Sequence, residues 1–450
     1  MMAEVTVTSA ELRAPDEVVR ITRVLREAGF ETWTVGGAVR DALAGRTPGD
    51  WDLATAARPR DVQRIFRRTV PVGVAHGTVG VLGKDGRMYE VTTFRRDVET
   101  DGRHAVVHFA DSVEEDLQRR DFTINAVAWH ALTRELRDPH GGVPDLRDGV
   151  LRTVGDPRER FREDRLRVLR ALRFAARFGL RIDEATWAAA RESAPELPKL
   201  SAERVREELL KVLRETERPS VALRLYEGCG ALATLYPELQ ACVGVPAGAD
   251  DVWGHLLKTA DALPRHRAAL RLPALVHDIG KARTAEAGFA DHAAAGAAAA
   301  FGMLRRLKFS NADTDRVVHL VAQHSAIPAS DALEPDLRRW LRLVGAGYVG
   351  DVLRLRVADV RARGADPGDP RLRETAALRR RVGRILASAP ALVLGDLAIG
   401  GAELRRLGIP AGPLMGEILR DLLERVTDEP SLNTPEALTE IVRARLSSPG

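Results

Sequence analysis

The chain has 450 residues, of which 45% are hydrophobic and 29% charged, and its formal net charge is +4. This composition is typical of a globular protein of roughly two to four domains, and it excludes a disordered or fibrous chain. The longest run of small apolar residues, 293–300, is too short to span a bilayer, and the acidic start, broken by Pro15, is not a signal peptide. We therefore expect a cytoplasmic protein with no membrane partner. The sequence leaves its oligomeric state open.

The first predicted elements are a helix over residues 18–28, indicated by its apolar spacing, and a short buried strand over residues 32–35. Gly36 and Gly37 follow this strand directly, and two glycines there let the backbone pass close to a phosphate and offer it N–H groups. Arg40 stands where a cation can hold the same anion. The pattern predicts a phosphate-binding turn.

Two acids follow this turn. Asp50 and Asp52 are separated by one residue, so on an extended strand both carboxylates point to one face. Paired acids of this kind hold divalent metals, and metals beside a phosphate cradle serve phosphoryl transfer. The alternative is a glycine turn followed by two solvated acids. Residues 79–82 and 88–93 predict a hairpin, in which Glu90 either adds a third acid to the site or faces solvent.

From residue 158 onward the pattern changes to helices, with breaks at 244–251 and 364–370. Residues 151–180 hold nine arginines and four acids. In this stretch Asp164, Arg167, Arg170 and Arg173 recur every three residues, which predicts one ridge of a helix. A carboxylate accepts a hydrogen bond from an exocyclic amine, and guanidinium groups donate to ring acceptors or phosphates. One Asp–Arg pair can therefore accept C and A, which share an amino group beside a ring nitrogen, and reject U and G. The alternative is a ladder of salt bridges within the helix.

Three motifs in this order carry a family resemblance: GGAVRD at 36–41 with DWD at 50–52, RRDFTINA at 119–126, and EDRLRVLRALRF at 163–174. They resemble the class II tRNA nucleotidyltransferases, or CCA-adding enzymes, and the related bacterial poly(A) polymerases. The resemblance implies an α+β protein that begins with a polymerase-β-like nucleotidyltransferase head, a mixed sheet with helices. An all-α neck, an HD domain and a helical tail follow. The expected bounds are 15–146, 147–242, 251–363 and 371–450.

The resemblance also implies roles for the motif residues. Asp50 and Asp52 are expected to be catalytic and to hold Mg²⁺. Asp164 and Arg167 are expected to act as a protein template that selects the base. The remaining residues expected to bind the nucleotide are Gly36, Gly37, Arg40, Arg120 towards phosphate, Asp121 towards ribose, and Arg170 and Arg173 on the triphosphate.

The implied activity is the addition of C, C and A from CTP and ATP to the 3′ end of tRNA, whose acceptor stem would be gripped by shape. Residues 95–104 lack helical or strand periodicity and predict a mobile loop, similar to the loop of complete CCA-adding enzymes. Ala105 replaces the proline that the family often has after this loop. Two alternatives remain open: an A-adding enzyme or poly(A) polymerase, and an HD phosphohydrolase with an RNA-binding head.

A second constellation stands apart from these motifs. His277 and Asp278 follow an apolar run, with His255 before them and Asp359 after them. This order resembles the HD phosphohydrolase superfamily, and imidazole with carboxylate suits a divalent metal. The resemblance implies a second metal site at His255, His277, Asp278 and Asp359, with phosphohydrolase activity. The alternative is a degenerate helical domain that only supports RNA.

Three more histidines lie in the same region. His292 and His324 could extend the site to a second metal, and His319 is a weaker candidate.

Overall fold

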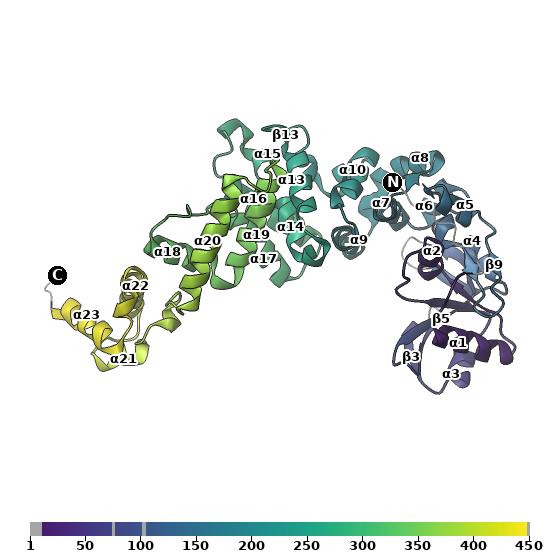
Figure 1. Cartoon of the computed structure of the whole chain (residues 1–450), viewed down its shortest axis with the longest axis horizontal. Helices are drawn as coiled ribbons and strands as arrows, with labels where there is room; N and C mark the ends of the chain where they lie inside the picture. The colour runs from purple at the N-terminus through teal and green to yellow at the C-terminus, as the bar shows by residue number, and fades with distance from the viewer. Residues whose placement is uncertain (1–10, 74–76, 101–104, 448–450) are drawn as a thin grey trace. The chain divides into compact units, whose positions relative to one another are not determined.

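A computed structural model of the chain describes residues 11–73, 77–100 and 105–447. The chain divides into two compact units, residues 1–237 and 238–450 (Figure 1). The first holds a mixed sheet with helices, and the second is mainly helical. The α+β class predicted from the sequence is thereby confirmed.

The sheet of the first unit has seven strands: β1 (Thr32–Val35), β2 (Asp52–Thr55), β3 (Thr69–Gly73), β4 (Thr78–Leu82), β5 (Met88–Thr93), β8 (Ala128–Trp129) and β9 (Leu136–Arg137). Their order is β3-β4-β5-β2-β1-β8-β9. Strands β2 and β5 run parallel, and the other neighbours are antiparallel. The parallel pair at the centre of the sheet brings the beginnings of β2 and β5 to one edge.

Side-chain alternation gives each face of the sheet its own core. On one face, Leu53 and Val91 pack with Ile21 of α1 (Asp16–Glu27) and Val62 of α3 (Pro59–Ile65). On the other face, residues of β1 and β2 pack with α4 (Val113–Gln118); this cluster includes Trp33, Val35, Ala54, Phe94, Val113 and Leu117. The short helix α2 (Gly37–Leu43) follows β1 directly. The central strands are thus buried on both sides, which fixes the position of the residues at their ends.

Predictions for this unit have mixed outcomes. The helix over 18–28 is confirmed as α1, and the hairpin of β4 and β5 is confirmed with antiparallel register. The mobile loop over 95–104 is wrong for its first part, because β6 (Arg95–Thr100) pairs with β7 (Ala105–Phe109). Residues 101–104 lie outside the described part of the chain.

After β9 the described part of the first unit is mainly helical, with one parallel two-strand pair, β10 (Val150–Leu151) with β11 (Arg181–Ile182). Phe122 of the second motif packs edge-on against Phe174, with ring centroids 5.8 Å apart. This contact holds the segment 119–126 against α7 (Leu166–Phe178). The helices after the sheet are α5 (Gly142–Arg147), α6 (Pro157–Glu163), α7 (Leu166–Phe178), α8 (Glu184–Ser193), α9 (Ala202–Glu215), α10 (Pro219–Cys229) and α11 (Ala231–Leu235).

Helices build most of the second unit: α13 (Val252–Asp261), α14 (Ala268–Val276), α15 (Lys281–Thr284), α16 (His292–Arg306), α17 (Asn311–Gln323), α18 (Glu334–Val344), α19 (Ala346–Ala362), α20 (Pro370–Ala387), α21 (Gly401–Arg406), α22 (Pro413–Asp428) and α23 (Pro435–Ser447). The short helix α12 (Pro237–Gln240) spans the division between the units. The break predicted at 244–251 contains a short antiparallel pair, β12 (Pro246–Ala247) with β13 (Asp250–Asp251). One apolar cluster joins α13, α14 and α17–α20, and another joins α21–α23. Among the described residues, no helix is long and apolar enough to cross a bilayer.

Candidate active site

The glycine turn before α2 lies against two other predicted site residues. Gly36 has a φ of 74°, a left-handed conformation that glycine adopts without strain. A Cβ atom at Gly36 would lie 3.0 Å from Nη1 of Arg120 and 3.9 Å from Oδ2 of Asp52. Because Gly36 has no side chain, the turn, a guanidinium group and a carboxylate come together at one point.

Asp52 and Glu90 lie side by side near the beginnings of the central strands β2 and β5. Leu53 pairs with Val91 across the parallel strands, so Asp52 and Glu90 are neighbours one residue earlier. Burial and the charge of Glu90, with a smaller effect of Asp50, raise the pKa of Asp52 to about 6, although Arg120 opposes the shift. An acid whose pKa is raised by burial and by neighbouring acids gains most from a bound cation. This donor set therefore fits a divalent metal, and it includes Glu90.

Asp50 is placed differently from the prediction. Strand β2 begins at Asp52, and Asp50 lies in the preceding irregular segment with an exposed side chain. The two acids therefore do not share one strand face. The charge of Asp50 still acts on Asp52. Its catalytic role stays a prediction.

A cavity of about 420 Å³ opens beside Asp52 and Glu90. Its volume suits a nucleotide, since ligand sites hold roughly 300–1,000 Å³. The lining contains both acidic and basic side chains, which suits a ligand with a triphosphate at one end and a polar base at the other. The charged residues of the lining are Asp52, Glu90, Arg95, Asp116, Arg119, Arg120, Asp121, Asp164, Arg167, Arg170 and Arg204.

Two arginines of the cavity are held by one buried acid. Asp116, whose side chain is 1% exposed, binds Arg119 at 3.1 Å and Arg120 at 2.9 Å. Burial alone would raise the pKa of Asp116, but the two guanidinium groups hold it below its usual value. The ionised acid keeps Arg120 beside Asp52 and Gly36.

Asp121 belongs to the cavity lining, but its carboxylate is held by other protein groups. Its Oδ2 accepts two hydrogen bonds from Arg170, at 2.6 and 2.8 Å, and its Oδ1 accepts one from Asn125 at 2.9 Å. Burial raises the pKa of Asp121, but the opposing effects of Arg170 and Asn125 are larger together and bring the pKa below its usual value, so the carboxyl is ionised. The two hydrogen bonds to Oδ2 hold the Arg170 guanidinium at the cavity wall.

Asp164 and Arg167, the predicted base-selecting pair, both line the cavity, and the backbone N–H of Arg167 donates to the carbonyl of Asp164, but their side chains bind other partners. Asp164 lies between α6 and α7 in an extended conformation, so it precedes the helix rather than lying on its ridge. Arg167 donates to Glu163 at 2.5 Å and to the carbonyl of Arg119 at 3.2 Å. Each side chain therefore reaches the cavity from a fixed position.

Two arginines that were predicted to bind the nucleotide, Arg40 and Arg173, lie away from the cavity, and Gly36 and Gly37 are not part of its lining either. The Arg40 side chain is buried, donates to Asn125 Oδ1 at 2.6 Å, and stacks 4.2 Å from the centroid of the Phe178 ring. Arg173, with a side chain that is 4% exposed, binds Glu208 at 2.7 Å on α9. Neither belongs to the cavity lining. The helix ridge predicted from 164 to 173 is therefore split, because its last arginine joins α7 to α9.

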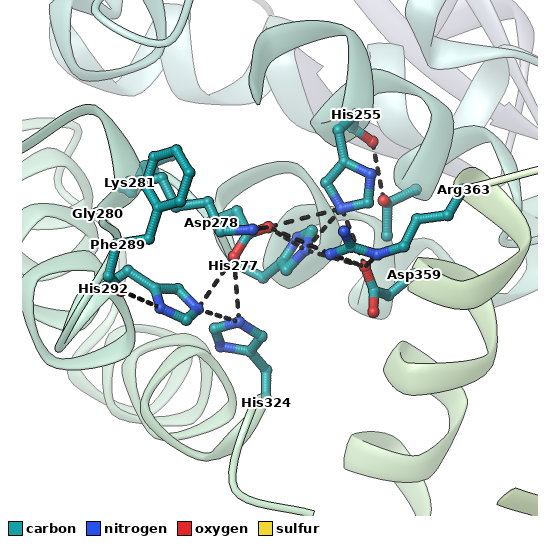
Figure 2. A network of polar contacts seen from close by, with 12 residues as sticks. His255, His277, Asp278, Gly280, Lys281, Phe289, His292, His324, Asp359 and Arg363 are labelled. Atoms are coloured by element: carbon teal, nitrogen blue, oxygen red, sulfur yellow. Dashed lines mark hydrogen bonds and ion pairs between the residues drawn. The ribbon is translucent and has the colours of Figure 1, made fainter. Parts of the chain in front are cut away.

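A second cluster lies in the second unit (Figure 2). Asp278 is its centre: Oδ2 lies 3.3 Å from Nε2 of His277, and Oδ1 lies 3.2 and 3.4 Å from Nε2 of His324 and His292. Nε2 of His255 is 3.0 Å from Oδ1 of Asp359 and 3.3 Å from Nε2 of His277. The two oxygens of Asp278 thus face two groups of imidazoles.

The tautomers of three of these histidines are set by backbone carbonyls. Nδ1 of His277 lies 2.9 Å from the carbonyl of Ala274, and the Nδ1 atoms of His292 and His324 lie 2.9 and 2.6 Å from carbonyls one helical turn away. A proton on Nδ1 that is donated to a carbonyl leaves Nε2 free to bind a metal. The donor set therefore fits divalent metal at two adjacent positions.

Cations also reach these carboxylates. Lys281 binds Asp278 at 2.6 Å, and Arg363 binds Asp359 at 2.9 Å. Burial opposes ionisation, but the pKa of Asp278 is held far below its usual value by His277, His324 and Lys281. His319 lies outside the cluster, with Nε2 2.6 Å from the carbonyl of Val344.

Comparison with known proteins decides the family. Residues 32–152 match the Poly A polymerase head domain, residues 179–242 the probable RNA and SrmB-binding site of polymerase A, and residues 251–360 the HD domain. The CCA-adding enzyme of Geobacillus stearothermophilus is 35% identical over 94% of this chain and 95% of its own length. The chain belongs to the CCA-adding enzyme family.

Two further matches differ in extent. The CCA-adding enzyme of Enterococcus faecalis is 43% identical, over 52% of this chain and 59% of its own length. The crystal structure of Bacillus stearothermophilus CCA-adding enzyme in complex with CTP has a TM-score of 0.72 and 33% identity, and covers 96% of this chain and 98% of that one. The chain is therefore a nucleotidyltransferase with the fold of this family, and the resemblance seen in its motifs is confirmed.

Asp116 and Arg204 line the cavity but were not predicted from the sequence. Asp116 precedes Arg119 and Arg120 by three and four residues, and this helical spacing was a signal that could have found it. Arg204 lies 40 residues from its partner Asp164. No local pattern connects these two, so only the folded chain shows their contact.

Proposed function

We propose that this chain adds C, C and A to the 3′ end of tRNA, using CTP and ATP and no nucleic-acid template. One observation supports it above the others: a single cavity holds the acidic pair at the sheet edge, the arginines beside the glycine turn, and the Asp164–Arg167 pair. The acids suit the reacting phosphate, the arginines suit the rest of the triphosphate, and the pair suits the base.

Asp52 is proposed to hold Mg²⁺ with Asp50 and Glu90. When bound, the metal supplies Lewis-acid activation of the RNA 3′-hydroxyl and neutralises charge on the departing pyrophosphate. The side chains of the protein orient the reactants. Arg120, held by Asp116, faces the position of the phosphates, and Arg170, held by Asp121, lies on the adjacent wall. The hydroxyl then attacks the α-phosphate in line with the leaving group.

The base is proposed to be read by Asp164 and Arg167. The carboxylate accepts from the amino group of cytosine or adenine, and the guanidinium donates to the neighbouring ring nitrogen. Uracil and guanine present a keto oxygen and an N–H there, so both protein groups lose their partners.

Arg167→Ala is expected to relax base selection. We expect incorporation of CTP and ATP to fall about tenfold or more, and UTP and GTP to fall much less, because the lost contact exists only for the matched bases. Single-nucleotide incorporation into tRNA lacking its 3′ end measures this for all four nucleotides. The matched control is Arg162→Ala, an exposed arginine of α6 outside the cavity. A common factor for all four nucleotides would instead make Arg167 a phosphate ligand or a structural residue.

We also propose a domain organisation for this function. We propose residues 15–146 as the nucleotidyltransferase head, 147–242 as the neck with RNA-binding elements, 251–363 as the HD domain and 371–450 as the tail. tRNA is the proposed partner, and the cytoplasm is the proposed location of the protein. Labelled CTP, ATP or both, given with tRNA lacking its 3′ end, separates CCA addition from A addition and poly(A) synthesis by product length.

A second function is proposed for the HD domain, on the observation that three histidines are held in the metal-binding tautomer around Asp278. His255, His277, Asp278 and Asp359 would hold one divalent metal, and His292 and His324 would complete a second position with Asp278. Such metals supply a hydroxide nucleophile for hydrolysis of phosphoesters. The proposed substrate is a phosphoester at an RNA 3′ end, such as a 2′,3′-cyclic phosphate, whose removal would precede CCA addition.

His277→Ala is expected to lower divalent metal affinity of the HD domain at least about 100-fold and to abolish hydrolysis, because a buried ligand is lost. Metal content after incubation with Mn²⁺ or Ni²⁺ and dialysis checks the first effect, and phosphodiesterase and phosphatase assays check the second. CTP incorporation is expected to stay near normal, since the two sites share no residue. His266→Ala, an exposed histidine of the same unit, is the control. A parent protein that retains no metal and hydrolyses nothing would leave the domain a structural support.

A further inference from the structure

The carboxylate of Asp164 is held by a residue from a different helix. Nη2 of Arg204, near the start of α9, lies 2.7 Å from Oδ2 of Asp164. The two side chains are 38% and 30% exposed, and both line the nucleotide cavity. This is therefore a half-buried ion pair at the wall of the site, and it is the contact that Asp164 makes in place of one with Arg167.

The second oxygen of Asp164 is also engaged. Oδ1 accepts the backbone N–H of Leu166 at 3.0 Å, at the start of α7. Two donors from different elements, one on each oxygen, set the plane of the carboxylate. Each carboxylate oxygen has two lone-pair sites, so an acceptor position remains for the amino group of a base. A carboxylate paired with a guanidinium only accepts hydrogen bonds, and it therefore offers nothing to a keto oxygen.

The position of Arg204 is fixed by the core rather than by the cavity. Glu208 lies one turn further along the same face of α9, and it binds Arg173 of α7 in a pair with side chains 1% and 4% exposed. The buried pair locks α9 against α7, and Arg204 projects from the locked helix to the cavity. The packing of α9 against α7 thus fixes the position of Arg204, and Arg204 in turn fixes the carboxylate of Asp164.

We propose that Arg204 is a specificity-positioning residue, which orients the carboxylate of Asp164 for the amino group shared by cytosine and adenine. This inference rests on the proposed template role of Asp164. A direct role of Arg204 on the triphosphate is the competing explanation, and a surface pair without function is another. These three explanations predict different changes in base selection, overall rate and stability when Arg204 is replaced.

The test is Arg204→Ala, measured with all four nucleotides on tRNA lacking its 3′ end. We expect the preference for CTP over UTP, and for ATP over GTP, to fall about tenfold, because a mobile carboxylate no longer separates an amino group from a keto oxygen. Arg214→Ala is the matched control: the same residue type on the same helix, exposed, with an ion pair to Glu207 at 3.8 Å. It is expected to leave the preference unchanged. If the alanine variant does not fold, Arg204→Lys gives the same comparison, because lysine keeps the charge but loses the planar fork.

A double-mutant cycle with Asp164→Ala separates the explanations. If Arg204 acts through Asp164, the double variant has the same preference as Asp164→Ala alone. An additive loss, a common fall for all four nucleotides, or an unchanged preference in Arg204→Ala would each overturn the inference while the template role of Asp164 stands. If Asp164→Ala itself keeps full base preference, the template assignment fails, and the inference fails with it.

Discussion

Asp52→Ala is expected to reduce nucleotide incorporation at least about 100-fold, because loss of a metal ligand removes several kcal/mol of transition-state stabilisation. Asp52 lies at the start of a central strand, beside Glu90 and close to the glycine turn, so its loss removes one carboxylate of the proposed metal site. Asp50→Ala is expected to act in the same direction. Primer extension on tRNA lacking its 3′ end measures both variants. Retention of more than about a tenth of the parent rate in Asp52→Ala would contradict the metal assignment.

The carboxylate of Asp52 is expected to favour catalysis but to lower the stability of the folded chain. Its folded-state pKa, about 6, lies above the ordinary value of 3.8, so between these pH values the folded chain binds more protons than the unfolded chain. Ionised Asp52 therefore costs folding stability as the pH rises through this window. In a chelator at pH 7.5, Asp52→Asn is expected to unfold at a temperature equal to or above that of the parent. Glu27→Ala, an exposed acid at the end of α1, controls for loss of a negative charge.

Glu208→Ala is expected to destabilise the first unit by about 3 kcal/mol, because it leaves a buried guanidinium without its buried partner. The side chains of Arg173 and Glu208 are 4% and 1% exposed, and the remaining partner of Arg173, Glu215, is 30% exposed. For a unit of this size, the loss corresponds to a fall of roughly 6 °C or more in unfolding temperature. Thermal unfolding followed by circular dichroism measures it.

The matched control for this variant is Arg177→Ala. Arg177 binds the same Glu215 at 2.7 Å, but its side chain is 34% exposed. A pair of this kind contributes at most about 1 kcal/mol, so the control is expected to change the unfolding temperature little. An unchanged unfolding temperature in Glu208→Ala, together with a raised KM for CTP, would show that Arg173 serves the triphosphate after all, as the motif implies.

The sequence by itself determined the family and the residue types of the site. The motifs at 36–41, 50–52, 119–126 and 163–174 are short and continuous, so their spacing carries the chemistry directly. The strand 32–35, the hairpin around Lys84 and the order of His255, His277, Asp278 and Asp359 were also readable, because apolar periodicity and turn residues are local signals. These features depend on neighbours in the chain.

Only the tertiary structure decided what each charged residue contacts. Arg173 and Arg40 are identical in type to Arg167 and Arg120, yet the first two are buried in ion pairs and aromatic contacts and the others line the cavity. Asp164 precedes its helix because α6 ends at Glu163, and its partner Arg204 comes from α9. A local pattern specifies which helix face a residue occupies, but helix packing decides whether that face meets another helix or an open cavity. Long-range ion pairs such as these leave no periodic trace in the sequence, because their two members belong to separate elements.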